Sequence, residues 1–167
     1  FNNDDIKLFS NILDSKNRDL KAFYYKNIFI NEDLILWNNF SFLRESFLYK
    51  KVKISKWNKF KFLLKSKFRN KRTIKNGIWI IDTWSHVYYH WLFDVLQKSL
   101  MIKNNHKIII PRSFLIHDFI LETIKIFQLK LEIIEPDTIL KVNNLISIPT
   151  VNFSGMFFKE KLIDIKS

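Results

Sequence analysis

The residues best suited to chemistry lie in one stretch, residues 79–98, where an apolar run leads into a helical pattern. Within it, His90 and Asp94 are four residues apart, and this spacing places two side chains on one face of a helix. A carboxylate beside an imidazole raises the basicity of the ring and fixes its tautomer, as a general base requires. The spacing therefore predicts a base at His90 that Asp94 orients. An ordinary exposed pair, which contributes only about 0.2–0.5 kcal/mol, has the same spacing and stays open as an explanation.

A metal site is the alternative chemistry for this helix. His86 lies one turn before His90, so His86, His90 and Asp94 also have the spacing of ligands on one helical face. Zinc sites usually draw their ligands from more than one element, and no supporting ligand is evident elsewhere in the sequence. The chain contains no cysteine, which excludes disulfides, thiolate zinc sites and cysteine nucleophiles. We therefore expect neither a metal nor a cofactor.

Aromatic residues are concentrated around the same stretch. Five lie within thirteen residues: Trp79, Trp84, Tyr88, Tyr89 and Trp91. Core packing explains most of them, although such rings also stack on sugar rings. Ligands of open α/β sheets bind beyond the carboxyl ends of the strands, so we expect a site in the segment from Asp82 to His90.

The order of patterns along the second half predicts the elements that hold this site. Apolar runs predict strands at residues 77–82, 107–110, 129–134 and 145–148. Helical patterns cover residues 85–103 and the segment from Ser113, as N-cap, to Gln128, and a last helix starts near Lys159. Because parallel strands need crossover helices, the pattern predicts an α/β fold with a Rossmann-like, mostly parallel sheet covered on both faces.

The first half gives other patterns. Residues 1–21 predict an N-terminal helical segment, and residues 22–167 a single domain. Runs rich in Phe, Tyr and Ile over residues 24–30 and 34–37 predict short strands. Residues 57–72 predict a basic amphipathic helix that runs into a basic loop. We expect Trp57, Phe60 and Leu64 to face inward and the lysines to face solvent.

Charge and glycine content limit the partners. The formal net charge of +12 attracts anionic partners such as nucleic acid, lipid head groups or nucleotide diphosphates. With only two glycines, Gly77 and Gly155, the chain lacks the glycine-rich turn that cradles a pyrophosphate. This domain is therefore not expected to be the main nucleotide binder. No apolar stretch reaches the roughly 18 residues that cross a bilayer, and no secretory leader is evident. We expect a cytoplasmic protein that can lie at the inner face of the membrane.

Residues 88–96, Tyr-Tyr-His-Trp-Leu-Phe-Asp-Val-Leu, resemble a motif of glycosyltransferase family 61, whose bacterial members are often capsular polysaccharide biosynthesis proteins. The family motif, Asn-Tyr-Tyr-His-Trp-Leu-x-Asp-x-Leu-Pro-Arg, follows a short strand and opens a helix. Flanking patterns from about residue 26 are similar, including residues 44–47 and 109–111. Val87 departs from the family's Asn, and Gln97-Lys98 departs from its Pro-Arg. The family's second-domain motifs have no counterpart here.

The resemblance implies a GT-B glycosyltransferase, in which two Rossmann-like domains face a cleft. Residues 22–167 would supply the acceptor-side domain, and a further domain would bind the nucleotide-sugar donor. It implies sugar transfer to a glycan or lipid-linked glycan acceptor, with His90 as base, Asp94 as its orienting partner and no metal. The expected substrate contacts are Tyr89, Trp91, Asp82 and Trp84. We expect this chain alone not to transfer sugar.

A basic α/β domain without catalysis stays open as an alternative. Residues 59–72 could bind nucleic acid, with affinity that falls steeply as salt rises, or anionic lipid. No zinc finger, aromatic RNA-binding signature or helix-turn-helix pattern is evident, so no nucleic-acid partner is expected. Peripheral contact with an anionic membrane would suit an enzyme that elongates a membrane-linked glycan.

Overall fold

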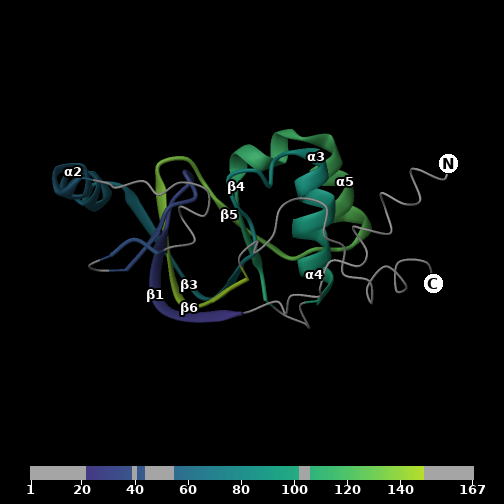
Figure 1. Ribbon diagram of the computed structural model, residues 1–167, viewed down its shortest axis with the longest axis horizontal. Coiled ribbons are helices and arrows are strands. Elements are labelled where there is room, and N and C mark those ends of the chain that lie inside the picture. Colours follow the sequence, from purple (N-terminus) through teal and green to yellow (C-terminus); the bar gives the residue numbers. More distant parts are fainter. Residues whose placement is uncertain (1–21, 39–40, 44–54, 102–105, 149–167) are drawn as a thin grey trace, which may run out of the picture.

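A computed structural model describes residues 22–38, 41–43, 55–101 and 106–148, and the structural statements below concern these residues (Figure 1). The elements in chain order are β1 (Phe23–Ile30), β2 (Leu36–Trp37), α2 (Lys56–Lys67), β3 (Asn70–Trp79), α3 (Tyr88–His90), the π-helix η2 (Trp91–Leu96), α4 (Gln97–Met101), β4 (Ile108–Pro111), the 3-10 helix η3 (Arg112–Ile116), α5 (Asp118–Ile126), β5 (Leu131–Ile134) and β6 (Thr138–Ser147). The helical segment predicted over residues 1–21 and the helix predicted near Lys159 lie outside the described residues.

The strands form one mixed, mostly parallel six-stranded sheet with the order β2-β1-β6-β3-β4-β5. The neighbouring pairs β6–β3, β3–β4 and β4–β5 are parallel, whereas β1 pairs antiparallel with both β2 and β6. The predicted α/β class with a mostly parallel sheet is therefore confirmed. The antiparallel side of the sheet is an addition that the sequence patterns did not indicate.

Strands β3 and β6 are much longer than predicted. They pair in parallel from Asn70 opposite Thr138 to Trp79 opposite Ser147, whereas the apolar runs marked only residues 77–82 and 145–148. The first seven residues of β3 are polar or only partly buried, and the basic loop predicted there is wrong. Backbone ladder hydrogen bonds to β6 hold this part, and such bonds need no apolar pattern.

The core lies where β3 ends beside β4. All four residues of β4 are buried, as are Ile78, Trp79, Ile80 and Ile81. A strand buried on both faces reads as an unbroken apolar run, which explains why β4 was recognised in the sequence. Figure 1 shows α3, α4 and α5 together beside β4 and β5, with α2 at the opposite end of the molecule.

Two predicted helices are divided or shortened. The helix predicted from Ser85 begins at Tyr88, after a turn, and passes through the π-helix η2 before α4. The helix predicted from Ser113 is a 3-10 helix followed by α5, whose N-cap is His117 without a side-chain cap bond. Ser113 is therefore not the cap. No helix among the described residues is long and apolar enough to cross a membrane.

Helix α2 faces the sheet with a different side from the one predicted. Its first turn is capped by the Ser55 hydroxyl, which accepts a hydrogen bond from the backbone N–H of Asn58 at 3.2 Å. Phe62 packs edge-on against Trp37, with ring centroids 5.0 Å apart. The predicted inward residues are exposed instead, at 62% for Trp57, 56% for Phe60 and 45% for Leu64. Apolar residues occur on both sides of this helix, so periodicity alone selected the wrong one.

Candidate functional site

A closed turn ends the apolar part of β3 and sets the position of the motif. The backbone N–H of Asp82 donates to Ser85 Oγ at 2.8 Å. Asp82 Oδ1 in turn accepts from the backbone N–H of Trp84 at 2.9 Å and from the Ser85 hydroxyl at 3.1 Å. Asp82 and Ser85 are both buried. Asp82 was predicted to contact substrate. In the structure its carboxylate shapes the turn, and this structural role explains an aspartate here without a substrate.

The predicted pair meets on the helix that follows. His90 Nδ1 lies 2.8 Å from Asp94 Oδ2, and the side chains are only 19% and 12% exposed. An ionised Asp94 accepts a hydrogen bond from Nδ1–H of His90. The unprotonated Nε2 of the neutral ring can then take a proton from a ligand. The pair spans the start of η2, and π-turns inside helices are frequent at functional sites.

Sequence reasoning missed the third charged residue of this site. Lys98 is 2% exposed, and its Nζ donates to the backbone carbonyl of Ile80 at 3.2 Å. Burial lowers its pKa from 10.5 to about 8, against the opposing effect of the charges of Asp94 and Asp82. The available signal was spacing, because His90, Asp94 and Lys98 follow one another at intervals of four.

The carboxylate of Asp94 interacts with both His90 and Lys98. Burial raises the pKa of its carboxyl, and the hydrogen bond from His90 and the positive charge of Lys98 act in the opposite direction. A nearby negative charge, that of Asp82, raises it further. The result is a chain of coupled groups that runs from buried Lys98 through Asp94 to the less buried His90. A change of charge on His90 therefore alters the electrostatic environment of Asp94 and, through it, of Lys98, and both are shielded from water.

One exposed aromatic ring contacts His90, and two others lie on the same short helix. The ring of Trp84 stacks on the imidazole with centroids 6.4 Å apart and planes 29° apart. Trp84, Tyr88 and Tyr89 are 51%, 50% and 64% exposed. The rings of Tyr88 and Tyr89 are in edge contact at 5.6 Å. Of these three exposed rings, Trp84 contacts the imidazole of the candidate base, whereas Tyr88 and Tyr89 contact each other on α3.

Trp91 belongs to the core and not to this surface. Its side chain is fully buried, and its indole N–H donates to Thr123 Oγ1 of α5 at 2.7 Å. The Thr123 hydroxyl lies 2.9 Å from the carbonyl oxygens of Phe119 and Ile120. The prediction of Trp91 as a substrate contact is therefore corrected: this residue joins the motif helix to α5. Tyr88, which was not among the expected substrate contacts, is 50% exposed.

His86 does not join His90 and Asp94. It lies in the turn before α3, where its ring is 6.1 Å from that of His117 and 6.0 Å from that of Phe114. The helical phase that suggested a ligand series begins only at Tyr88. Within the described ranges, no group of three or more His, Asp or Glu side chains could hold a metal ion.

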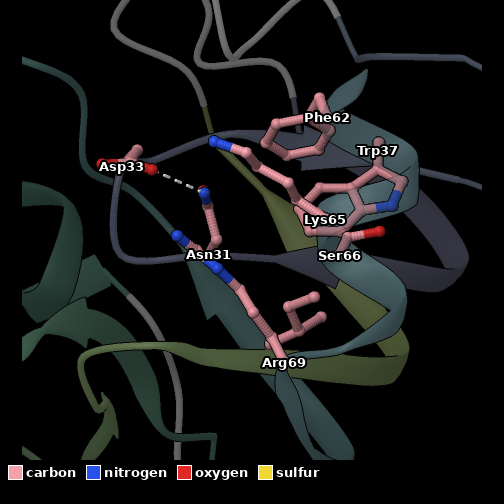
Figure 2. Close-up of a pocket in the computed structure, with 8 residues that line it drawn as sticks. Asn31, Asp33, Trp37, Phe62, Lys65, Ser66 and Arg69 are labelled. Carbon is pink, nitrogen blue, oxygen red and sulfur yellow. Dashed lines mark hydrogen bonds between the residues drawn. The ribbon is translucent and has the colours of Figure 1, made fainter. Parts of the chain in front are cut away.

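A separate small pocket lies beside α2, with a volume of about 70 Å³. Its lining residues are Asn31, Asp33, Trp37, Phe62, Lys65, Ser66, Arg69 and Ile139. Figure 2 shows Lys65 and Arg69 reaching towards the segment of Asn31 and Asp33, whose side chains are hydrogen-bonded at 2.8 Å. This space suits a few water molecules and is well below that of a typical substrate pocket. It lies at the α2 end of the molecule, away from α3.

Three comparisons with known proteins add no relative. No family model, no curated protein and no solved structure matches this chain. The function therefore rests on the geometry around His90 and on the resemblance of residues 88–96.

Proposed function

We propose that the protein transfers a sugar from a nucleotide-sugar donor to a glycan acceptor, as the acceptor-side, Rossmann-like half of a GT-B glycosyltransferase. The observation that carries the proposal is the 2.8 Å contact between His90 and Asp94, which is largely shielded from solvent and bordered by the exposed ring of Trp84. The resemblance of residues 88–96 to family 61 adds the reaction class. It also favours a place in capsular or surface polysaccharide biosynthesis.

His90 acts as the base in this proposal. Its Nε2 takes the proton from an acceptor hydroxyl while the acceptor oxygen forms a bond to the anomeric carbon of the donor sugar. The bond between that carbon and the nucleotide diphosphate breaks, and the leaving group keeps the bonding electrons. Asp94 stabilises the imidazolium that forms, and such a base contributes roughly 10²–10⁴-fold to the rate.

Burial separates this pair from an ordinary surface pair. An exposed helical pair leaves both groups in water, whereas burial here raises the pKa of Asp94 and lowers that of Lys98. Holding such groups out of water costs stability, and groups perturbed in this way are concentrated at functional sites. The base and its partner are thus held in a fixed arrangement with a cation behind them.

The acceptor binds across the exposed rings. The apolar faces of sugar rings stack on aromatic side chains, and the ring of Trp84 already lies against the imidazole, with centroids 6.4 Å apart. A sugar on Trp84 or Tyr89 would place a hydroxyl near His90. The donor phosphates require cations and backbone amides at a helix start, which we assign to a further domain.

Sugar transfer by the natural full-length protein tests the proposal. A panel of nucleotide sugars is offered with oligosaccharide acceptors, and release of nucleoside diphosphate is compared with and without acceptor. We expect acceptor-dependent release. Trp84→Ala and Tyr89→Ala should raise the KM for acceptor by roughly two- to tenfold each, since stacking on one ring is worth about 0.5–1.5 kcal/mol. Ile116→Ala, which truncates another exposed side chain, serves as the matched control. Acceptor KM values unchanged in both aromatic variants would contradict the assigned binding surface.

A further inference from the structure

The positive charge of this protein is concentrated in one part of the sequence. Residues 46–81 contain twelve Lys or Arg and no Asp or Glu, while the other sixteen basic residues are balanced by sixteen acidic ones. This region therefore accounts for the whole formal charge of +12. Helix α2 and the whole of β3 lie within it. A site for an anionic partner is thus expected at the α2 end of the molecule, independently of the chemistry at His90.

An apolar stripe runs along the outer side of α2. Trp57, Phe60, Leu64 and Phe68 follow one another at intervals of three and four, which places them on one helical face. They are 45% to 85% exposed. Phe62, on the opposite face, packs against Trp37 at 5.0 Å and Phe42 at 5.3 Å. The stripe therefore points away from the sheet.

Lysines flank this stripe. At 100° per residue, Lys61 and Lys65 lie on one side of it and Lys67 on the other; all three are exposed, and Lys65 also lines the small pocket. Lys61 Nζ is 5.2 Å from the centroid of the Trp57 ring, which also stacks on Phe60 at 5.9 Å. No acidic residue lies on α2. Aromatic and apolar side chains bordered by lysines are typical of helices that lie in the plane of a membrane interface.

We propose that this outer face of α2, formed by Trp57, Phe60, Leu64 and Phe68 with Lys61, Lys65 and Lys67 beside them, docks on an anionic lipid bilayer. The rings enter the boundary between head groups and acyl chains, and the lysines remain at the phosphates. A second copy of the chain would bring like charges together. A nucleic acid would use the lysines but would leave a continuous apolar stripe exposed. Lipid satisfies both parts of this face.

Vesicle co-sedimentation of the purified protein tests the inference. Vesicles of phosphatidylcholine alone are compared with vesicles that also contain phosphatidylglycerol, over a salt series. We expect binding to the anionic vesicles only, weakened by salt. Lys61→Glu with Lys65→Glu should lower the binding constant roughly 30-fold or more. Trp57→Ser with Phe60→Ser should lower it roughly tenfold or more, because it removes apolar area that the bilayer buries.

Matched controls separate charge and fold from docking. Lys26→Glu with Lys125→Glu makes the same charge change at exposed lysines on β1 and α5, and should leave binding within about threefold. Thermal unfolding monitored by circular dichroism confirms that each variant is folded; Trp57→Ala with Phe60→Ala replaces the serine pair if that pair is not. No binding to anionic vesicles, or equal binding by folded aromatic variants, would overturn the inference. Binding of a duplex oligonucleotide with no vesicle binding would assign the face to nucleic acid and overturn it as well.

Discussion

The two ends of the molecule use charge in opposite ways. At the motif end, three charged or ionisable side chains, His90, Asp94 and Lys98, are withdrawn from solvent and coupled to one another. At the α2 end, Lys61, Lys65 and Lys67 lie exposed beside an apolar stripe. The excess of basic residues that gives the net charge lies in residues 46–81, the region that contains α2. In this protein, amino-acid composition indicates where a charged partner can bind, whereas the burial of ionisable side chains indicates where a reaction can be catalysed.

The largest expected effect is a difference in stability between variants of two tryptophans at the motif end. Trp91→Ala should lower the free energy of unfolding by about 3–5 kcal/mol, because it removes a fully buried ring and the hydrogen bond to Thr123. Trp84→Ala should change it by less than about 1 kcal/mol, since half of this side chain is exposed. Urea unfolding measures both. Equal losses would show that the motif has no division between core and binding surface.

The next effect concerns the buried cation. The pKa of Lys98 is lowered from 10.5 to about 8 in the folded protein. Between these values the unfolded chain binds a proton that the folded chain does not, so the free energy of unfolding should increase as pH rises from about 8 to about 10.5. The increase should reach about 3 kcal/mol at most. Lys98→Met should lack it. Parallel curves for wild type and Lys98→Met would contradict the buried charge.

Strand β3 connects the two ends, and Gly77 marks the change from exposed to buried residues along it. A Cβ at this position would lie 2.5 Å from Cδ1 of Ile109, a fully buried residue of β4 that has little room to move. Gly77→Ala should therefore destabilise by about 1–3 kcal/mol. Asn76→Ala, at the exposed neighbour, is the control and should cost well below 1 kcal/mol. A neutral Gly77→Ala would show that β3 and β4 pack more loosely.

The smallest effect belongs to the basic end. Lys61→Glu with Lys65→Glu should change the free energy of unfolding by no more than about 0.5 kcal/mol per residue, because exposed charges contribute little to stability. The same pair is expected to have a large effect on vesicle binding. A loss of stability comparable to that of Trp91→Ala would mean that these lysines hold α2 in place and are not reserved for a partner.

The sequence patterns predicted what local apolar runs can encode. The buried end of β3 (although the predicted strand ran on to residue 82), most of β4, all of β5, and the helical position of His90 and Asp94 agree with them. The polar first half of β3 and the β1–β6 pairing did not, since they depend on hydrogen bonds between strands far apart in the sequence.

Within the candidate site, the sequence could not separate core from surface. Trp84, Tyr89 and Trp91 are close in the chain, but the turn at residues 83–87 and the π-helix decide which rings face inward. Lys98 was missed because a lysine is expected at the surface. Only the folded structure shows that it is buried and hydrogen-bonded to the carbonyl of Ile80. Trp57 and Phe60 were placed inward for the converse reason, since apolar rings are expected in cores.

The central claim, that His90 is a catalytic base, is tested most directly by the turnover of His90→Ala in the natural full-length protein. Its kcat should be lower than that of wild type by roughly 10²-fold or more, with acceptor KM little changed. His117→Ala, which removes a second imidazole near the same helix, is the matched control and should keep wild-type kcat. Full activity of His90→Ala beside a folded, active control would contradict the claim.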